Sequence, residues 1–400
     1  MKMTRNKWNV REESLALFLA FIIMFGYPFN MYMEYCVAAL MAFSVRHCNP
    51  DIAIKLKSSK LFFVCGLIWA FSCLYGNNTE FALKYMFMYF AAYFVSINAS
   101  TEIFRRMLKY LLILGGVHVS FIMLDFLNHD LVINVGSRFL SSEQLAINDH
   151  LHTWSGACAG LTGQTGQAAL FVVIFMYAVV AFAAKDKLYV LLLAPAIIAV
   201  LLTQKRSFLG FGLLFSIGYL LYESKNIRNS SKVMLIVLGC ATFFAMQYYI
   251  ANYFDVSGIA DKIEEGSMSN RNVLWAKMLD LFNSNPLLGI GLYSTDKIFG
   301  MTGHNIYIQL LCENGLLGAS VFFIMLARSL FLAIKCRAKS DIVAFSRMTI
   351  LFITAYGLFG NPIYEIQTLM LLMISATVLE RERNRHTKVL IRKIKYTYDK

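Results

Sequence analysis

The chain has 400 residues, of which 58% are hydrophobic and only 15% are charged, and its mean hydropathy is +0.57. A soluble domain carries about 25% charged residues. The apolar residues fall in blocks of roughly 15 to 25 residues, the length that crosses a bilayer as a helix. This composition excludes an ordinary soluble protein. An outer-membrane barrel would need alternating strands of about ten residues, and the sequence has none.

In chain order, the apolar blocks predict an all-α fold, a polytopic transmembrane helical bundle of about twelve spans that forms a single domain over residues 1–400. Some of the blocks are short for a span, so the predicted number is approximate. The predicted spans are residues 14–30, 31–45, 61–76, 81–97, 110–127, 166–184, 188–203, 207–222, 233–252, 313–334, 344–359 and 363–379.

Two connections between the predicted spans are long, at residues 128–165 and 253–312. Loops of this length are uncommon unless they have a function. We expect both to contain short helices and to lie on the far side of the membrane from the N-terminus. The chain then ends in a basic tail, residues 380–400.

The formal net charge of +13 comes from 37 Lys and Arg against 24 Asp and Glu. If the N-terminus is cytoplasmic, most of the basic residues fall in the segments predicted to be cytoplasmic, as the positive-inside rule requires. Both termini are therefore predicted to be cytoplasmic. The charge indicates topology, and we interpret the tail 380–400 as an anchor on anionic lipid, not as a nucleic-acid site.

The eight cysteines are scattered singly, and no CxxC pair occurs. This pattern indicates neither a zinc site nor a disulfide framework. We expect no metal-ligand cluster and no cofactor.

One turn does not fit the positive-inside rule. Gln204-Lys205-Arg206-Ser207 connects two apolar blocks on the far side of the membrane. Two adjacent cations there cost insertion free energy unless a partner compensates them. The alternative, a cytoplasmic turn, would place residues 223–232 and their three basic residues outside. We therefore interpret the turn as an anion site.

The segment RNVLWAKMLDLF in the second long connection is predicted to be a helix that Ser269 or Asn270 caps. Its apolar residues suit a helix on the membrane interface. Arg271 lies in its first turn, where the helix dipole disfavours a cation. An anionic partner would explain this placement. The alternative is an ordinary exposed arginine.

His304 lies where the chain returns to the apolar region. A neutral imidazole can accept a proton near neutral pH, although a histidine at an interface can also be structural. Glu313 lies close to the start of the next span. A carboxylate in a membrane is usually functional or paired, so Glu313 could be functional or could balance Arg206.

These motifs together resemble the O-antigen polymerase and O-antigen ligase superfamily of bacterial inner-membrane proteins. The resemblance rests on the order and spacing of short motifs over residues 160–320. The motifs are GLTG at 160–163, QKRSFLG at 204–210, SNRNVLWAKMLDLF at 269–282, NPLLGIGLY at 285–293 and HNIYIQLLCENGLLG at 304–318.

The resemblance implies a glycosyltransferase whose donor is an oligosaccharide on undecaprenyl pyrophosphate, and whose reaction needs neither metal nor cofactor. Arginine forks suit a pyrophosphate leaving group, and a histidine can act as general base. The implied catalytic residues are His304, Arg206 and Arg271. Arg206, Lys205, Arg271 and Arg138 are the implied pyrophosphate ligands. Asn305, Glu313 and Tyr307 are the implied supporting residues, and Glu313 would orient His304 or hold the fold.

Among superfamily reactions, we expect an O-antigen polymerase, which joins lipid-linked repeat units at the periplasmic face of the inner membrane. Two alternatives stay open: a ligase that transfers polymer to lipid A–core, and a transporter or flippase for a lipid-linked sugar. The expected partners are the lipid-linked oligosaccharide, membrane lipids and a protein that regulates chain length, and no nucleic acid is expected.

Overall fold

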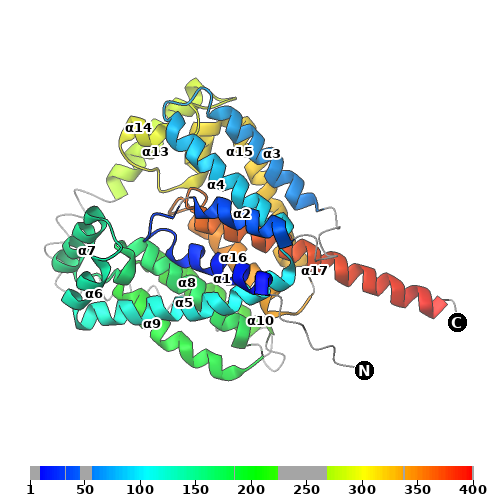
Figure 1. Cartoon of the computed structure of the whole chain (residues 1–400). Coiled ribbons are helices and arrows are strands. Elements are labelled where there is room, and N and C mark those ends of the chain that lie inside the picture. The colour runs from blue at the N-terminus through cyan, green and yellow to red at the C-terminus, as the bar shows by residue number, and fades with distance from the viewer. Residues whose placement is uncertain are drawn as a thin grey trace.

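The computed structural model describes residues 10–31, 33–45, 56–183, 185–223, 268–336 and 338–398 (Figure 1). Within these ranges the protein is all-α, and no strand occurs. The helices before the first long connection are α1 (Val10–Phe25), α2 (Glu34–Val45), α3 (Lys57–Ser72), α4 (Thr79–Asn98) and α5 (Thr101–Leu127).

Both long connections contain helices, as predicted. The first contains α6 (His129–Gly136), α7 (Ser142–Ser155) and the 3₁₀ turn η3 (Gly160–Thr162), and the second contains α13 (Met268–Ser284) and α14 (Ser294–Phe299). The remaining elements are α8 (Thr165–Ala183), η4 (Lys187–Leu192), α9 (Leu193–Leu202), α10 (Arg206–Glu223), α15 (Ile306–Lys335), α16 (Asp341–Tyr356) and α17 (Ile366–Tyr398).

The prediction of an all-α helical membrane protein is confirmed. Among the described residues, three helices are long and apolar enough to cross a membrane: α5, α8 and α15. Shorter apolar helices cover residues Glu34–Val45, Lys187–Leu202 and Arg206–Tyr222. Eleven of the twelve predicted spans coincide with described helices, and the twelfth, 233–252, lies outside the described residues.

The predicted boundaries were wrong where polar residues continue a helix. The predicted span 110–127 begins too late, because α5 begins at Thr101 and includes Arg105, Arg106 and Lys109. Ser100 caps this helix by accepting a hydrogen bond from the Ile103 N–H. Basic residues are good helix formers, so charge alone did not end the helix.

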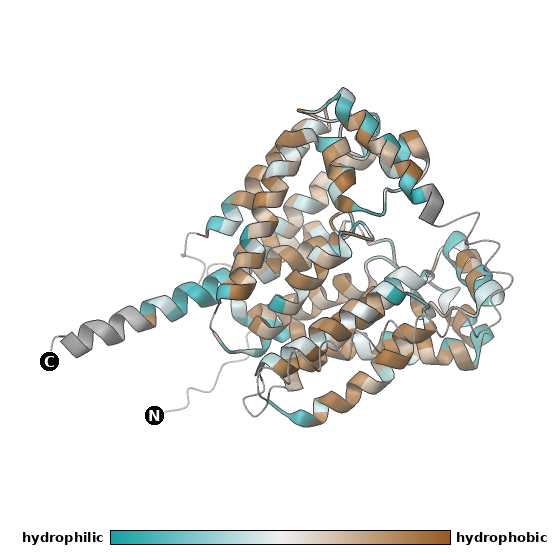
Figure 2. Ribbon diagram, turned by 180° about the vertical axis from the view of Figure 1, so that it is seen from behind, coloured by the Kyte–Doolittle hydropathy of each residue, from teal (hydrophilic) through white to brown (hydrophobic). Residues whose placement is uncertain are grey.

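Helix α8 forms the centre of the bundle. All of its residues except Gly166 are buried, as expected for a helix that is apolar on every face. It packs against α5, α9, α10 and α16. The helices α6, α7, α13 and α14 lie at the end of the molecule that is opposite the projecting C-terminal part of α17 (Figure 1). Apolar residues dominate the helices between these two ends (Figure 2).

Two adjacent charged residues of α17 join the ends of α3 and α4. Glu380 accepts hydrogen bonds from the Lys57 and Ser58 N–H groups, at 3.1 and 2.8 Å, and from the Arg328 guanidinium at 2.6 Å. Its negative charge therefore lies at the N-terminus of α3, where the helix dipole favours an anion.

Arg381 makes the complementary contact. Its side chain is buried and donates to the carbonyl oxygens of Ile97 at 2.9 Å, Ala99 at 2.5 Å and Ser96 at 3.4 Å, at the C-terminus of α4. A cation is favoured at this end of a helix. Glu380 and Arg381 thus provide hydrogen-bond partners for the backbone at the start of α3 and at the end of α4, two helices that lie much earlier in the sequence.

Replacing Arg381 with Met should lower the free energy of unfolding by about 2–4 kcal/mol, because it leaves the three carbonyl groups of α4 buried without a donor. Thermal unfolding in detergent can be followed with a thiol-reactive dye, since Cys65, Cys73 and Cys312 are buried until the fold opens. The matched control is Lys388→Met at an exposed position of the same helix. Equal stability of the two variants would contradict the assignment.

Candidate functional site

The turn that carries the two adjacent cations is short and held from one side by the first long connection. Helix α9 ends at Leu202, and α10 begins at Arg206. Gln204 adopts a left-handed backbone conformation, with φ of 58°. Its side-chain amide donates to the Ser155 carbonyl, and the Cys158 N–H donates to the Leu202 carbonyl at 2.9 Å. Ser155 and Cys158 of the first long connection therefore hold this turn in place.

His304 lies in a second strained turn, just before α15. Its φ is 48°, a conformation that costs free energy for a residue with a side chain and that often occurs at functional sites. The preceding residue, Gly303, donates its N–H to Gln309 Oε1 at 3.0 Å and accepts a hydrogen bond from the Trp275 indole at 2.6 Å. Helices α13 and α15 therefore hold this turn together.

Arg271, Lys205 and His304 come together at one site, although they belong to separate segments. Partial burial lowers the pKa of His304, and the positive charges of Arg271 and Lys205 lower it further. Partial burial also lowers the pKa of Lys205, with a further contribution from Arg271. The three side chains retain exposed surface. The cations thus favour the neutral imidazole, which can accept a proton.

Among the described residues, no carboxylate compensates the positive charge of this site. Lys205, Arg206 and Arg271 are exposed, and within the described ranges no carboxylate lies within ion-pair distance of any of them. By contrast, Arg105, Arg106 and Arg328 form ion pairs elsewhere in the fold. Three neighbouring cations with a histidine beside them make a surface suited to a phosphate or pyrophosphate group.

The remaining predicted residues have different placements. Arg206 is exposed beside Lys205 as the first residue of α10. Arg138 is exposed in the turn between α6 and α7, and no described contact joins it to the site. Asn305 caps α15 by accepting hydrogen bonds from the Tyr307 and Ile308 N–H groups, and the Tyr307 hydroxyl donates to Thr354 O at 2.6 Å. Asn305 and Tyr307 thus position the start of α15.

Glu313 is fully buried, and its described hydrogen bonds do not include His304 or Arg206. Of the roles predicted for it, its contacts correspond to holding the fold. Its donors are the backbone N–H groups of Tyr293 at 2.9 Å and Thr295 at 3.3 Å, the Thr295 hydroxyl, the Gln309 amide at 3.1 Å and the Tyr364 hydroxyl.

Gln309 relays this network to the histidine turn. Its amide nitrogen donates to Glu313 and to the Thr295 hydroxyl, while its carbonyl oxygen accepts from Gly303 N–H and from Asn361 at 2.9 Å. Sequence reasoning missed Gln309, because a glutamine near the start of an apolar helix has no distinctive pattern. Among the described contacts, Gln309 connects Glu313 to the turn of His304.

Helix α15 is broken at Gly315, which has φ of 58° and ψ of −166°. The motif Gly289-Ile290-Gly291 lies against the break. The backbone hydrogen bonds between the two segments include Ile290 N to Cys312 O at 3.0 Å, Gly291 N to Glu313 O at 2.8 Å and Leu316 N to Pro286 O at 2.8 Å. The glycine turn thus supplies the partners that the broken helix lacks.

The expected cap of α13 was wrong, because Ser269 and Asn270 lie inside the helix and do not precede it. Leu274 and Met278 are buried with Cys312, so α13 packs one apolar face on α15. Val273 remains 52% exposed. The placement of α13 on a membrane interface stays a prediction.

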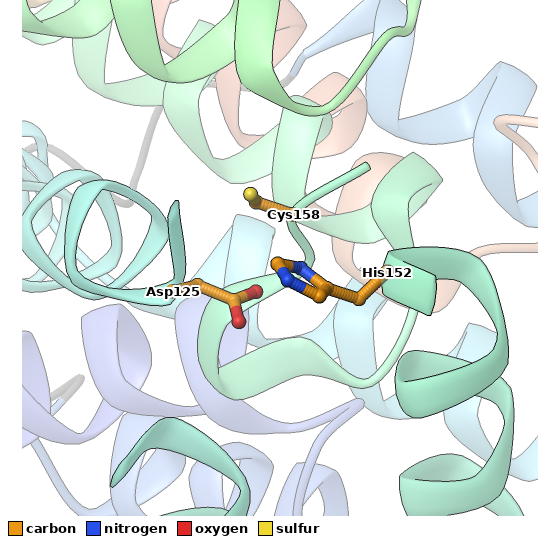
Figure 3. A group of neighbouring side chains, drawn as sticks. All are labelled: Asp125, His152 and Cys158. Atoms are coloured by element: carbon orange, nitrogen blue, oxygen red, sulfur yellow. The ribbon is translucent and has the colours of Figure 1, made fainter. Parts of the chain in front are cut away.

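The structure also assembles potential metal ligands that are distant in sequence. Asp125, His152 and Cys158 place one ligand atom each within 4.8 Å of one another (Figure 3). The expectation that the chain holds no cluster of this kind was therefore wrong. No pattern in the sequence predicts this group, because the spacing of its three residues matches no metal motif.

A cavity of about 480 Å³ lies beside the Glu313 network. Its lining includes Tyr85, Tyr293, Tyr364, Lys84 and Glu365. Tyr293 and Tyr364 also hold Glu313. Aromatic faces with a few polar groups are common in ligand pockets of this size, so a ligand there would contact the network that supports the His304 turn.

Residues 188–323 match the family model described as O-antigen ligase. The predicted resemblance to the O-antigen polymerase and ligase superfamily is confirmed. The match includes Lys205, Arg206, Arg271 and His304. Members of this family are glycosyltransferase-like enzymes of the membrane that act on lipid-linked polysaccharide. No curated protein and no solved structure matches the chain.

Replacing Gly315 with Ala should destabilise the protein by about 2–4 kcal/mol, because an added Cβ would lie 2.4 Å from Leu287 O at a φ that favours glycine. Thermal unfolding in detergent measures this change. Gly218→Ala in α10 is the control, since its Cβ would meet nothing within 4 Å. If Gly315→Ala and Gly218→Ala unfold at the same temperature, the close contact between the glycine turn and the break does not stabilise the protein.

Proposed function

We propose that this protein is an O-antigen polymerase that joins undecaprenyl-pyrophosphate-linked repeat units at the periplasmic face of the bacterial inner membrane. The single observation that carries the proposal is the approach of Arg271 and Lys205 to His304, with Arg206 beside them. A basic site next to a neutral imidazole meets the two needs of glycosyl transfer from a pyrophosphate donor.

The first need is to stabilise the leaving group. As the bond between the anomeric carbon and the pyrophosphate oxygen breaks, the pyrophosphate keeps the electron pair and gains negative charge. Arg206 and Arg271 would bind its oxygens with their guanidinium forks, and Lys205 would add a third positive charge. Cations fixed before the reaction stabilise developing charge without reorganising, which is usually the largest contribution to catalysis.

The second need is to remove a proton from the attacking sugar hydroxyl. Neutral His304 would accept it as the oxygen bonds to the anomeric carbon. The free enzyme favours this neutral form, because partial burial lowers the pKa of His304 and the charges of Arg271 and Lys205 lower it further. Asn305, Glu313 and Tyr307 would support the base by fixing the start of α15 and the turn before it.

The proposed topology places this chemistry outside the cytoplasm. It has about twelve spans over residues 1–400, periplasmic connections at 128–165 and 253–312, cytoplasmic termini and a basic tail at 380–400. Support comes from the opposite placement of the loop helices and the end of α17 (Figure 1). Arg138, in the first of these connections, would contact the donor only at the edge of the site.

A ligase is the second candidate, because it uses the same donor and the family match bears that description. The apolar character of the chain, rich in Phe, Tyr and Met, favours the polymerase. A transporter is the third, and it would be expected to have paired broken helices in its two halves. In the described part of the chain, α15 is the helix with a left-handed break. A protein that regulates chain length is proposed as a partner of the polymerase.

Deleting the gene and examining the surface polysaccharide separates these functions. Loss of a polymerase leaves core bearing one repeat unit. Loss of a ligase leaves bare core and accumulates lipid-linked polymer. A long-chain ladder that persists in the deletion strain would rule out both enzymes.

In the deletion strain, complementation with Arg206→Ala, Arg271→Ala or His304→Ala should fail to restore the ladder. Loss of one oriented donor to developing charge typically lowers kcat by 10²–10³-fold, and loss of a general base by 10²–10⁴-fold. The control is Lys277→Ala at an exposed position of α13. Normal ladders from all three site variants, with membrane insertion confirmed, would show that the site is elsewhere.

The pH dependence of kcat/KM should report His304. Its pKa is lowered from 6.5, so the base is neutral at pH 7, and activity should fall only as the pH drops below about 6.5. Replacing Lys205 with Gln removes a charge that lowers this pKa, so the acidic limb should move to higher pH. Lys277→Gln is the control. If the acidic limb of the pH profile does not move in Lys205→Gln, the charge of Lys205 does not influence the pKa of His304.

A further inference from the structure

The group formed by Asp125, His152 and Cys158 lies outside the basic site. Asp125 is near the end of α5, His152 is in the last turn of α7, and Cys158 is in the segment that leads to η3. Asp125 and Cys158 are buried and His152 is half-buried, and the three side chains point toward one another (Figure 3). One carboxylate oxygen, one imidazole nitrogen and one sulfur thus share a small volume.

The dimensions suit a small metal ion. The three ligand atoms lie within 4.8 Å of one another. Ligand atoms around tetrahedral Zn²⁺ lie roughly 3.3–3.8 Å apart, as its bond lengths of about 2.0–2.3 Å require. Side-chain movements of about 1 Å would therefore close the group around an ion.

The Asp125 carboxylate already has the kind of hydrogen-bond partners that usually orient a carboxylate bound to a metal. Asp125 Oδ2 accepts the Gly160 N–H at 2.8 Å, and Asp125 Oδ1 lies 2.6 Å from His129 Nδ1. The His129 ring stacks on the His152 ring at 3.8 Å, while its Nε2 lies 3.5 Å from Asp149. Hydrogen-bonded outer residues of this kind orient metal ligands.

His152 provides an independent observation. Its Nδ1 is buried, and no described hydrogen-bond partner reaches it. A buried ring nitrogen without a partner costs free energy that a bound ion would recover. The Asp125–His129 pair accounts for Asp125 without a metal, but it leaves this His152 nitrogen unexplained.

We propose that Asp125, His152 and Cys158 bind one Zn²⁺ ion, with water in the fourth position and His129 as an outer residue. The combination of thiolate, imidazole and carboxylate suits Zn²⁺, whereas Mg²⁺ and Ca²⁺ prefer oxygen ligands. Binding replaces the Cys158 S–H proton with the metal and releases that proton to solvent.

The ion would be a positioning element for the basic site. Ser155 and Cys158, on either side of the bend that follows α7, hold the turn of Gln204 through two hydrogen bonds. An ion bound to His152 and Cys158 would restrain this bend, and through it Lys205 and Arg206. It would contact neither the donor nor the acceptor.

The test uses the purified full chain in detergent, stripped with a chelator and then titrated with Zn²⁺ alone. We expect one tightly bound Zn²⁺ per chain and a higher unfolding temperature. With Co²⁺ as a spectroscopic substitute, we expect the charge-transfer absorption of a thiolate ligand. Cys158→Ser should abolish that absorption, and His152→Gln should weaken Zn²⁺ binding at least tenfold. His129→Ala should weaken it by about 10–100-fold, as outer residues do.

The matched controls are His150→Gln, on the same helix two residues away, and Cys36→Ser, a free cysteine in α2. Both should bind Zn²⁺ as the unmodified chain does. The proposal is overturned if the stripped chain does not take up Zn²⁺, or if Cys158→Ser and His152→Gln bind it as tightly as the controls. Metal content and Co²⁺ absorption do not depend on glycosyl transfer, so failure here leaves the proposed polymerase activity to its own tests.

Discussion

The break in α15 imposes the strictest physical requirement in this structure. A helix that crosses a bilayer must satisfy its backbone groups internally, and the left-handed Gly315 interrupts that pattern. The turn at Gly289 and Gly291 replaces the missing partners through backbone hydrogen bonds. It approaches so closely that side chains are excluded, since a Cβ on Gly289 would lie 2.5 Å from the Glu313 carbonyl carbon and oxygen. The break and the glycine turn therefore require each other.

This requirement extends to the chemistry of the basic site. The glycine turn leads into Tyr293, and Tyr293 and Thr295 donate to the buried Glu313. Gln309 then connects that carboxylate to the backbone beside His304. A base held at a strained φ needs such support from its surroundings. The fold thus connects the interior of a membrane helix to an exposed imidazole through one amide side chain.

The sequence predicted the features that depend on composition along the chain, and missed those that depend on contacts across it. The uniformly apolar composition of residues 166–184 correctly predicted α8. The positive-inside rule and the helix dipole singled out Lys205 and Arg271, which the structure brings near His304. The break at Gly315 was missed, because a single glycine in an apolar run is compatible with an unbroken helix. The metal-ligand group and the role of Gln309 were missed because their partners lie on other segments.

The contacts of Glu380 and Arg381 also have a consequence for how the protein is made. These residues complete the ends of α3 and α4, yet they belong to the last helix of the chain. Synthesis proceeds from the N-terminus, at about 5–20 residues per second. Until the ribosome has released α17, α3 and α4 therefore lack partners that they later need. A chain terminated before α17 would leave the N-terminus of α3 and the C-terminus of α4 without these partners, which would make it a substrate for quality-control proteases.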